Sequence, residues 1–244
     1  HGHHRRQRQM CIRDRNKIVS MSEKEKVCIV TGVGPDKGTG AEIAKLFGKK
    51  KYKVAMIARN KKNLNDLEKK YKNIFSYPCD VGDLEKFKKT LKKIKNDLGP
   101  ADVVIHNAPS ASRGSILKLN PDDLELNFRV NTTALLHLVR ETLPSMLSKK
   151  KGSILITGNT AATRGKSHWG FFASTKAAQR ILAESIAREF GPKGIHVAYF
   201  IIDAAIDTPR TRPYMQPEKP DDYFSKPAAI AEEMYKTVLQ DKST

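Results

Sequence analysis

Cysteine is scarce in this chain, and its few thiols form no recognisable pattern. The 244 residues include three cysteines, Cys11, Cys28 and Cys79, which lie far apart in the sequence. Disulfide-dependent domains carry many cysteines, and structural zinc sites need Cys or His ligands at short spacings. We therefore expect no disulfide framework, no metal site and a reducing, cytoplasmic compartment.

Long apolar runs are absent as well. A membrane-spanning helix needs about 20 predominantly apolar residues in succession, and no stretch of the sequence has this character. The N-terminus also lacks the apolar segment that is typical of a secretion signal. We therefore expect no membrane association.

Acidic residues are few, because 26 Asp and Glu stand against 45 Lys and Arg, which gives a formal net charge of +19. Runs such as Lys49-Lys50-Lys51 and Lys149-Lys150-Lys151 could bind nucleic-acid phosphates and release counterions. No aromatic residues alternate with these runs, which fall at the ends or on the polar faces of expected helices. We therefore interpret them as solvated surface and do not expect nucleic-acid binding.

Residues 1–20 lack the apolar periodicity of the rest of the chain. The run RQRQMCIRDR resembles the translation of a sequencing-library adapter, which would make Met21 the natural start; a disordered basic tail is the alternative. Without the five Arg, one Lys and one Asp of this segment, the net charge falls from +19 to +14. The predicted domain is residues 21–244.

Short apolar runs alternate with longer helical patterns along this domain. In the helical patterns, apolar residues recur every three or four positions. Apolar strands joined by crossover helices form a parallel sheet that is covered on both faces. We therefore predict an α/β fold: a single, three-layer, doubly wound parallel sheet of Rossmann type. The expected strands are 27–30, 54–58, the region of Phe75, 102–105, 153–157 and 197–202, and the expected helices are 41–47, 63–71, 84–98, 122–149, 172–190 and 228–239.

The first expected strand leads directly into a glycine-rich turn and then into a helix. Glycine permits positive φ and lets the backbone approach a pyrophosphate, whose charge is attracted by free N–H groups at a helix start. An ordinary tight turn could have the same composition. The position of this glycine-rich stretch between a first strand and a first helix nevertheless favours dinucleotide binding. The candidate phosphate-binding residues are Gly32, Gly34, Gly38, Thr39 and Gly40.

Arg59 and Asn60 follow the second expected strand, where a dinucleotide fold meets the adenosine ribose. An acid at this point would accept a hydrogen bond from the ribose 2′-hydroxyl, whereas an arginine suits a 2′-phosphate. We therefore predict NADP(H) in preference to NAD(H). The alternative is an arginine that is merely exposed at the end of a strand.

These motifs resemble the short-chain dehydrogenase/reductase family, whose fingerprint is Thr-Gly, three residues, Gly, any residue, Gly. Thr31-Gly32 and Gly38-Thr39-Gly40 correspond, but five residues separate Gly32 from Gly38, which indicates a two-residue insertion around Asp36-Lys37. The resemblance extends over residues 26–210. It implies further cofactor contacts from Asp80, Val81, Asn107, Ala108, Ile206 and Thr208, and it matches Asn131 to a helix asparagine that holds a water in the family's proton relay.

The resemblance breaks at the catalytic positions. The family uses a serine, a tyrosine and a lysine, with three residues between the last two. Lys176 is present here, but Phe172 stands at the tyrosine position, and Asn159, followed by Thr160, stands at the serine position. Loss of a general acid costs roughly 10²- to 10⁴-fold in rate. We therefore expect Asn131 and Lys176 to carry a residual relay, with Asn159 and Thr160 as polar partners, Phe172 facing the reacting carbon and water delivering the proton.

Other residues near this segment have weaker claims to a role. Ser174 should face away from the pocket, Tyr214 would lie in the loop that covers substrate, and Asp203 would place a carboxylate near the nicotinamide. His168 and Trp169 could line the substrate pocket, although surface or core packing explains them equally well.

The sequence also resembles a divergent, bacterial-type branch of the family in which phenylalanine occupies the tyrosine position. The matching runs are TGNTAATRG, FFASTKAAQRILAESIAREFGPKGIHVA and IDTPRTR. That branch usually continues with one more strand, so we expect the sequence to be truncated at its C-terminus.

We predict an NADP(H)-dependent oxidoreductase that transfers hydride to or from a small or medium-sized hydrophobic carbonyl or activated alkene. The alternative is a catalytically silent NADP(H)-binding sensor or interaction module. The family pairs the helix around 172–188 with its mate in dimers and tetramers, so a homodimer or homotetramer is expected beside the small-molecule substrate.

Overall fold

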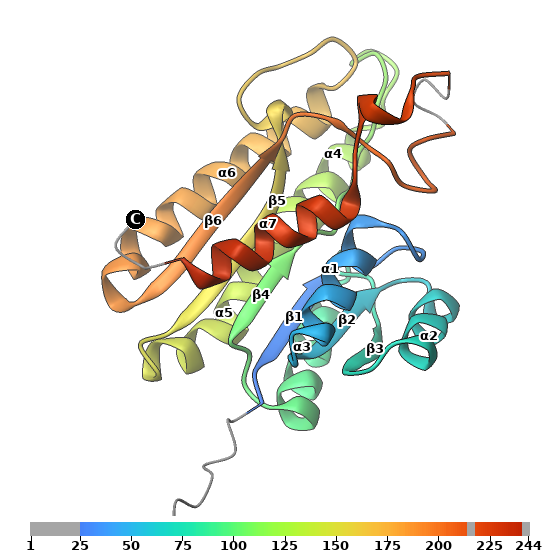
Figure 1. The fold of residues 1–244 in the computed structure, drawn as a ribbon. Coiled ribbons are helices and arrows are strands. Elements are labelled where there is room, and N and C mark those ends of the chain that lie inside the picture. The colour runs from blue at the N-terminus through green and yellow to red at the C-terminus, as the bar shows by residue number, and fades with distance from the viewer. Residues whose placement is uncertain (1–24, 214–217, 241–244) are drawn as a thin grey trace, which may run out of the picture.

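A six-stranded parallel sheet forms the centre of the protein in a computed structural model that describes residues 25–213 and 218–240 (Figure 1). The strand order is β3-β2-β1-β4-β5-β6, and every neighbouring pair runs parallel. The order reverses between β1 and β4, which is the doubly wound topology that was predicted. The strands are β1 (Val27–Thr31), β2 (Lys53–Ala58), β3 (Ile74–Pro78), β4 (Val103–His106), β5 (Gly152–Asn159) and β6 (Ile195–Ile202).

Helices cover both faces of this sheet and enclose two apolar cores. On one face α1, α2 and α7 contribute buried side chains such as Phe47, Leu64 and Met234. On the other face α3, α5 and α6 contribute side chains such as Phe87 and Leu138. The fold therefore has the predicted three layers. The helices are α1 (Thr39–Lys49), α2 (Lys61–Lys70), α3 (Leu84–Leu98), α4 (Pro121–Phe128), α5 (Ala134–Ser148), α6 (Gly170–Phe190) and α7 (Pro227–Leu239).

Local sequence explains where several helices begin. Asn60, Asp83 and Asn120 precede α2, α3 and α4, and each side chain accepts a hydrogen bond from a backbone N–H of the first turn. Such caps satisfy donors that have no partner inside a helix. α1 lacks a side-chain cap, because its preceding residue is Gly38. The N–H groups at the start of α1 are therefore not covered by a capping side chain.

Two features differ from the sequence expectation. The expected helix over 122–149 is interrupted by a π-helical turn, Arg129–Thr133, between α4 and α5. The spacing of apolar residues over 122–149 predicted one continuous helix, but α4 buries Asn127 and exposes Leu126 and Phe128, so the buried apolar face of α5 does not continue through α4. The stretch after Thr208, which showed no pattern, includes Phe224–Ser225 (β8), which pairs in parallel with Ala205–Ile206 (β7).

Within the described residues, no helix combines the length and apolar character needed to span a membrane. No group of three or more His, Cys, Asp or Glu side chains in that part of the chain could hold a metal ion. Cys28 and Cys79 are buried free thiols, and burial raises the pKa of both. The expectations for residues 1–20 and for Tyr214 lie outside the described residues.

Candidate active site

The predicted site residues follow the carboxyl ends of the strands. Thr31 ends β1, Arg59 follows β2, Asn107 follows β4, Asn159 ends β5 and Asp203 follows β6. Because the strands are parallel, these ends meet at one edge of the sheet, where ligands of doubly wound folds bind. The fold therefore brings the two halves of the predicted site to the same edge.

A buried hydrogen-bond network joins the ends of β1 and β4. The Thr31 hydroxyl accepts hydrogen bonds from the backbone N–H groups of Asn107 at 3.0 Å and Ala108 at 3.2 Å. Its own proton is therefore directed to Nδ1 of His106 at 3.1 Å, and Nε2 of His106 donates to the Val130 carbonyl at 3.1 Å. This network places the two loops of the predicted cofactor site in contact.

The glycine-rich turn is shaped by two close backbone approaches. Gly32 has φ +70°, and a Cβ there would lie 2.5 Å from the Ala108 Cα. A Cβ at Gly40 would lie 2.6 Å from the Gly32 carbonyl oxygen, whereas a Cβ at Gly34 would meet nothing within 4 Å. Asn107 Nδ2 also donates to the Gly32 carbonyl at 3.0 Å. The turn therefore requires glycine at positions 32 and 40, and any other residue at either position would displace it.

Asp36, in the region of the two-residue insertion that the family pattern indicates, forms ion pairs with the two helices beside the turn. The Asp36 carboxylate lies 2.8 Å from Lys45 Nζ of α1 and 2.7 Å from Lys70 Nζ of α2. These two ammonium groups hold the pKa of Asp36 well below its usual range. Lys37 has a left-handed backbone, with φ 69°. The insertion is thus a fixed part of the structure.

Of the side chains predicted to contact the adenosine part of the cofactor, some already bond to the protein backbone. The Arg59 side chain is exposed, whereas the Asn60 side chain caps α2 through the Asn63 N–H at 3.0 Å. One carboxylate oxygen of Asp80 accepts from the Gly82 N–H at 2.9 Å, and Val81 is buried. Asn60 and Asp80 therefore shape the surrounding backbone, while Arg59 projects from it.

Asn131, in the π-helical turn, is the centre of a buried polar cluster. Its Nδ2 donates to the Ser110 carbonyl and to the Thr175 hydroxyl, both at 2.8 Å, and its Oδ1 accepts from the Ser110 N–H at 2.8 Å. The Ser110 hydroxyl donates to Asn127 Oδ1 at 2.7 Å. The cluster ties the loop after β4 to α4 and to α6, which carries Lys176.

Lys176 is almost fully buried, and its ammonium is held by two acceptors. Nζ donates to the Thr157 carbonyl at 2.8 Å and to Gln179 Oε1 at 2.5 Å. Burial lowers the pKa of Lys176 to about 7, because the charged form loses hydration. An ammonium in this state can donate hydrogen bonds to a ligand and also exchange its proton near neutral pH.

Phe172 lies one helical turn before Lys176 and is also buried. Its ring packs against Trp169, with ring centroids 5.8 Å apart, and the Arg113 guanidinium stacks over Trp169 at 5.3 Å. Ser174 is exposed on α6, and its hydroxyl donates to the Phe171 carbonyl, so it faces away as expected. Position 172, which the sequence resemblance matches to the family's tyrosine, therefore carries a buried apolar ring.

Other predicted residues do not bond to the groups around Lys176 in the described structure. The Asn159 side chain accepts from the Ala161 N–H at 3.1 Å and caps a short 3-10 helix, Thr160–Ala162. Ile206 and Thr208 form a turn with Thr211, where the two threonine hydroxyls lie 2.7 Å apart. Asp203 is exposed. The structure thus bonds Asn131 to α6, the helix of Phe172 and Lys176, whereas the side chains of Asn159 and Thr208 bond to residues close in sequence and Ile206 ends β7.

The family profile described as short chain dehydrogenase matches residues 26–219. This match spans most of the chain and includes the glycine-rich turn, the Asn131 turn and the helix of Lys176. The chain belongs to the short-chain dehydrogenase/reductase family. Members of this family are oxidoreductases that bind nicotinamide cofactors and act on small molecules.

Individual relatives agree with this assignment. Carbonyl reductase family member 4 of Xenopus laevis is 27% identical over 172 residues, which cover 70% of this chain and 72% of that protein. An alcohol dehydrogenase from the archaeon Thermococcus sibiricus, complexed with 5-hydroxy-NADP, is similar in structure, with 26% identity and a TM-score of 0.74 over 90% of this chain and 93% of that one. A short-chain dehydrogenase from Streptomyces avermitilis shares the fold, with 24% identity and a TM-score of 0.78 over 92% of this chain and 87% of that one.

Sequence reasoning missed three residues of the candidate site, of which Gln179 and His106 are buried and Tyr199 is partly buried. Gln179 contacts Lys176, Tyr199 contacts Gln179, and His106 bridges Thr31 and Val130. His106 ends β4 directly before Asn107, and the sequence gave it no role. Gln179 had a signal of its own, because a polar residue on the buried face of α6 needs hydrogen-bond partners.

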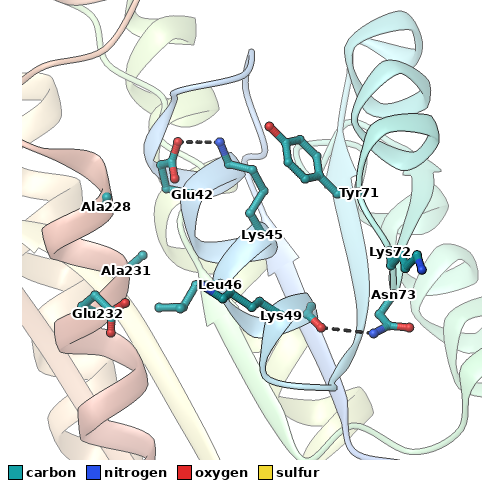
Figure 2. A pocket seen from close by; sticks show the side chains of 11 residues that line it. Glu42, Lys45, Leu46, Lys49, Tyr71, Lys72, Asn73, Ala228, Ala231 and Glu232 are labelled. Atoms are coloured by element: carbon teal, nitrogen blue, oxygen red, sulfur yellow. Dashed lines mark hydrogen bonds and ion pairs between the residues drawn. The ribbon is translucent and has the colours of Figure 1, made fainter.

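The groove of about 590 Å³ beside α1 and α7 is a separate feature (Figure 2). Figure 2 shows Glu42, Lys45 and Leu46 of α1 facing it, with Tyr71 on one side and Ala231 on the other. None of the predicted cofactor or catalytic residues lines this groove. It is lined by α1, α7 and the connection between α2 and β3, so it is separate from the candidate site at the sheet edge.

Proposed function

We propose that this dehydrogenase family member is an NADP(H)-dependent oxidoreductase. It transfers hydride to or from a small or medium-sized hydrophobic carbonyl or activated alkene. The observation that supports this proposal most directly is the buried Lys176 ammonium, which stands beside the Asn131 cluster and one helical turn after Phe172. A module that bound no cofactor would have little reason to keep a cation buried at this point, because burying a charge is costly.

The glycine-rich turn suits a pyrophosphate, because glycine at positions 32 and 40 lets the backbone fold tightly before α1, whose first N–H groups carry no capping side chain. When bound, the nicotinamide supplies or accepts the hydride. We assign Gly32, Gly34, Gly38, Thr39 and Gly40 to the pyrophosphate, Arg59 and Asn60 to the 2′-phosphate, Asp80 and Val81 to the adenine, Asn107, Ala108 and Lys176 to the nicotinamide ribose, and Ile206 and Thr208 to the carboxamide.

The preference for NADP(H) depends on Arg59, whose exposed guanidinium can pair with a 2′-phosphate. Replacement of Arg59 by alanine should weaken NADPH binding more than tenfold and leave NADH binding nearly unchanged. Fluorescence titration of the full chain with both cofactors measures this difference. Equal losses for the two cofactors would refute the assignment of Arg59.

The chemistry must proceed without a tyrosine hydroxyl, because Phe172 has no exchangeable proton. We propose that the Lys176 ammonium and the donors at Asn159 and Thr160 stabilise the charge that develops on the substrate oxygen, and that Asn131 holds α6 in place. Water then delivers the proton. The apolar Phe172 ring, packed on Trp169, would exclude water from the face of the reacting carbon.

We also propose that the chain forms a homodimer or homotetramer. Exposed apolar side chains lie on α4, α5 and α6, namely Leu126, Leu136 and Ile181, and Phe128 lies at the end of α4. Exposed apolar side chains on neighbouring helices can contribute to an association surface. Sedimentation velocity should show a dimer or larger species, and replacement of Ile181 by glutamate should dissociate it.

The full chain, assayed for NADPH oxidation against a panel of carbonyls and enones, tests the activity itself. We expect turnover by the wild type and faster turnover by Phe172→Tyr, because the added hydroxyl restores a general acid. Silence of the wild type with activity in Phe172→Tyr would favour the sensor. Silence of both proteins, together with NADPH binding, would count against every substrate class in the panel.

A further inference from the structure

Gln179 occupies the space between the reactive lysine and the π-helical turn. It is fully buried on α6, three residues after Lys176. Its Oε1 accepts from Lys176 Nζ at 2.5 Å, and its Nε2 donates to the Asn131 carbonyl at 2.5 Å. A single side-chain amide therefore bridges a candidate catalytic cation and the backbone of a second candidate site residue.

The orientation of this amide is determined by its neighbours. If the two ends were exchanged, the NH₂ group would face the Lys176 ammonium, and the oxygen would face the Asn131 carbonyl oxygen. Both contacts would be repulsive. The Tyr199 hydroxyl lies 3.2 Å from the Lys176 carbonyl oxygen and 3.3 Å from Gln179 Oε1, so its one proton is shared between two acceptors, which is compatible with the observed orientation. Gln179 therefore presents one fixed acceptor to Lys176.

This acceptor controls the direction of the ammonium. Lys176 has three N–H groups, and the Thr157 carbonyl and Gln179 take two of them. Among the described residues, these contacts leave one N–H for a ligand at the sheet edge. From this geometry, and resting on the proposed function, we infer that Gln179 is a positioning residue that orients Lys176 for the cofactor and stabilises its charged form.

The electrostatic surroundings of Lys176 make this role measurable. The titratable groups that face it are His106 from β4 and Tyr199 from β6. Burial keeps both of these neutral near neutral pH, since it lowers the pKa of His106 to about 3 and raises the pKa of Tyr199. Neither group therefore supplies a negative charge, and the amide oxygen of Gln179 is the side-chain acceptor that favours the ammonium.

Two substitutions with opposite effects test the inference. Gln179→Met keeps the length of the side chain but removes the acceptor, so the pKa of Lys176 should fall. Gln179→Glu places a carboxylate beside the ammonium, so this pKa should rise. Fluorescence titrations of the full chain with NADPH at a series of pH values give the pH at which binding is half lost. Relative to the wild type, this pH should be about one unit lower in Gln179→Met and about one unit higher in Gln179→Glu. A general loss of packing would weaken binding at every pH without moving the midpoint.

A direct titration separates this inference from the cofactor assignment. Isotopically labelled lysine, followed by NMR, reports the ionisation of Lys176 without any cofactor, and the signal is assigned by its absence in Lys176→Arg. Opposite shifts in Gln179→Met and Gln179→Glu would support the positioning role even if NADPH did not bind. Folded variants in which the Lys176 titration is unchanged would overturn it, whatever the outcome for cofactor binding.

Discussion

His106 shows how one buried side chain can connect two loops of a site. It accepts from the Thr31 hydroxyl and donates to the Val130 carbonyl, so both ring nitrogens are used in the neutral form. Burial, reinforced by the nearby Lys176 charge, lowers the pKa of His106 to about 3. Protonation would add a proton to the nitrogen that accepts from Thr31 and would break this hydrogen bond.

The pKa of His106 predicts a specific loss of stability in acid. An unfolded histidine binds a proton as the pH falls below about 6.5, whereas His106 stays neutral in the folded state down to about 3. The free energy of unfolding should therefore fall by up to about 1.4 kcal/mol per pH unit in this window because of His106. In His106→Asn this contribution is absent. Denaturant titrations of both proteins between about pH 7 and about pH 4 measure the difference.

If the unfolding free energies of wild type and His106→Asn changed in parallel over this range, His106 would not be neutral in the folded state. Carboxylates that titrate in the same window act equally in both proteins, so they cancel in the comparison.

Lys176 predicts a pH dependence of cofactor binding. Its pKa is lowered to about 7 by burial, so the ammonium is lost in the free protein as the pH rises through this value. An anionic cofactor with ribose hydroxyls binds the ammonium form better. NADPH affinity should therefore be highest below about pH 7 and fall by up to about tenfold per pH unit above it. Lys176→Met should bind more weakly and show no such decline, and equal pH profiles for the two proteins would contradict the account.

At the scale of elements, the glycine-rich turn offers a matched pair of substitutions. Gly32→Ala places a side chain at φ +70° and within 2.5 Å of the Ala108 backbone, whereas Gly34→Ala meets nothing within 4 Å. We expect Gly32→Ala to lower the free energy of unfolding by more than about 2 kcal/mol and to abolish NADPH binding. Gly34→Ala should change stability by less than about 0.5 kcal/mol. Chemical denaturation measures both, and similar losses in the two variants would show that the turn is not set by this contact.

The elements also show where the sequence was informative. The six strands and the amphipathic helices were predictable, because continuous apolar runs and helical periodicity follow directly from burial on two faces of a sheet. The π-helical turn at Arg129–Thr133 and the β7–β8 pair were not. The first lies between two segments that both carry apolar residues at helical spacing, and the second joins two segments of two residues each that no local signal connects.

For the molecule as a whole, the sequence could predict only those candidate site residues whose type and spacing match the pattern of the family. The glycine-rich turn, Arg59, Asn131, Phe172 and Lys176 could be identified, because the family pattern fixes their order along the chain. The partners that set their chemistry come from other elements. Gln179 accepts a hydrogen bond from Lys176, and the charge of Lys176 contributes to the lowered pKa of His106. Only the packing of α6 against the sheet reveals these relations.

The central claim is that this fold transfers hydride without the tyrosine of its family. NADPH labelled with deuterium at the nicotinamide carbon that donates hydride tests it directly, with the product analysed by mass spectrometry after a single turnover. The account predicts deuterium in the product of the wild type and more rapid transfer in Phe172→Tyr. NADPH binding by the wild type without any deuterium transfer, alongside transfer by Phe172→Tyr to the same substrate, would contradict it and identify the protein as a cofactor-binding module.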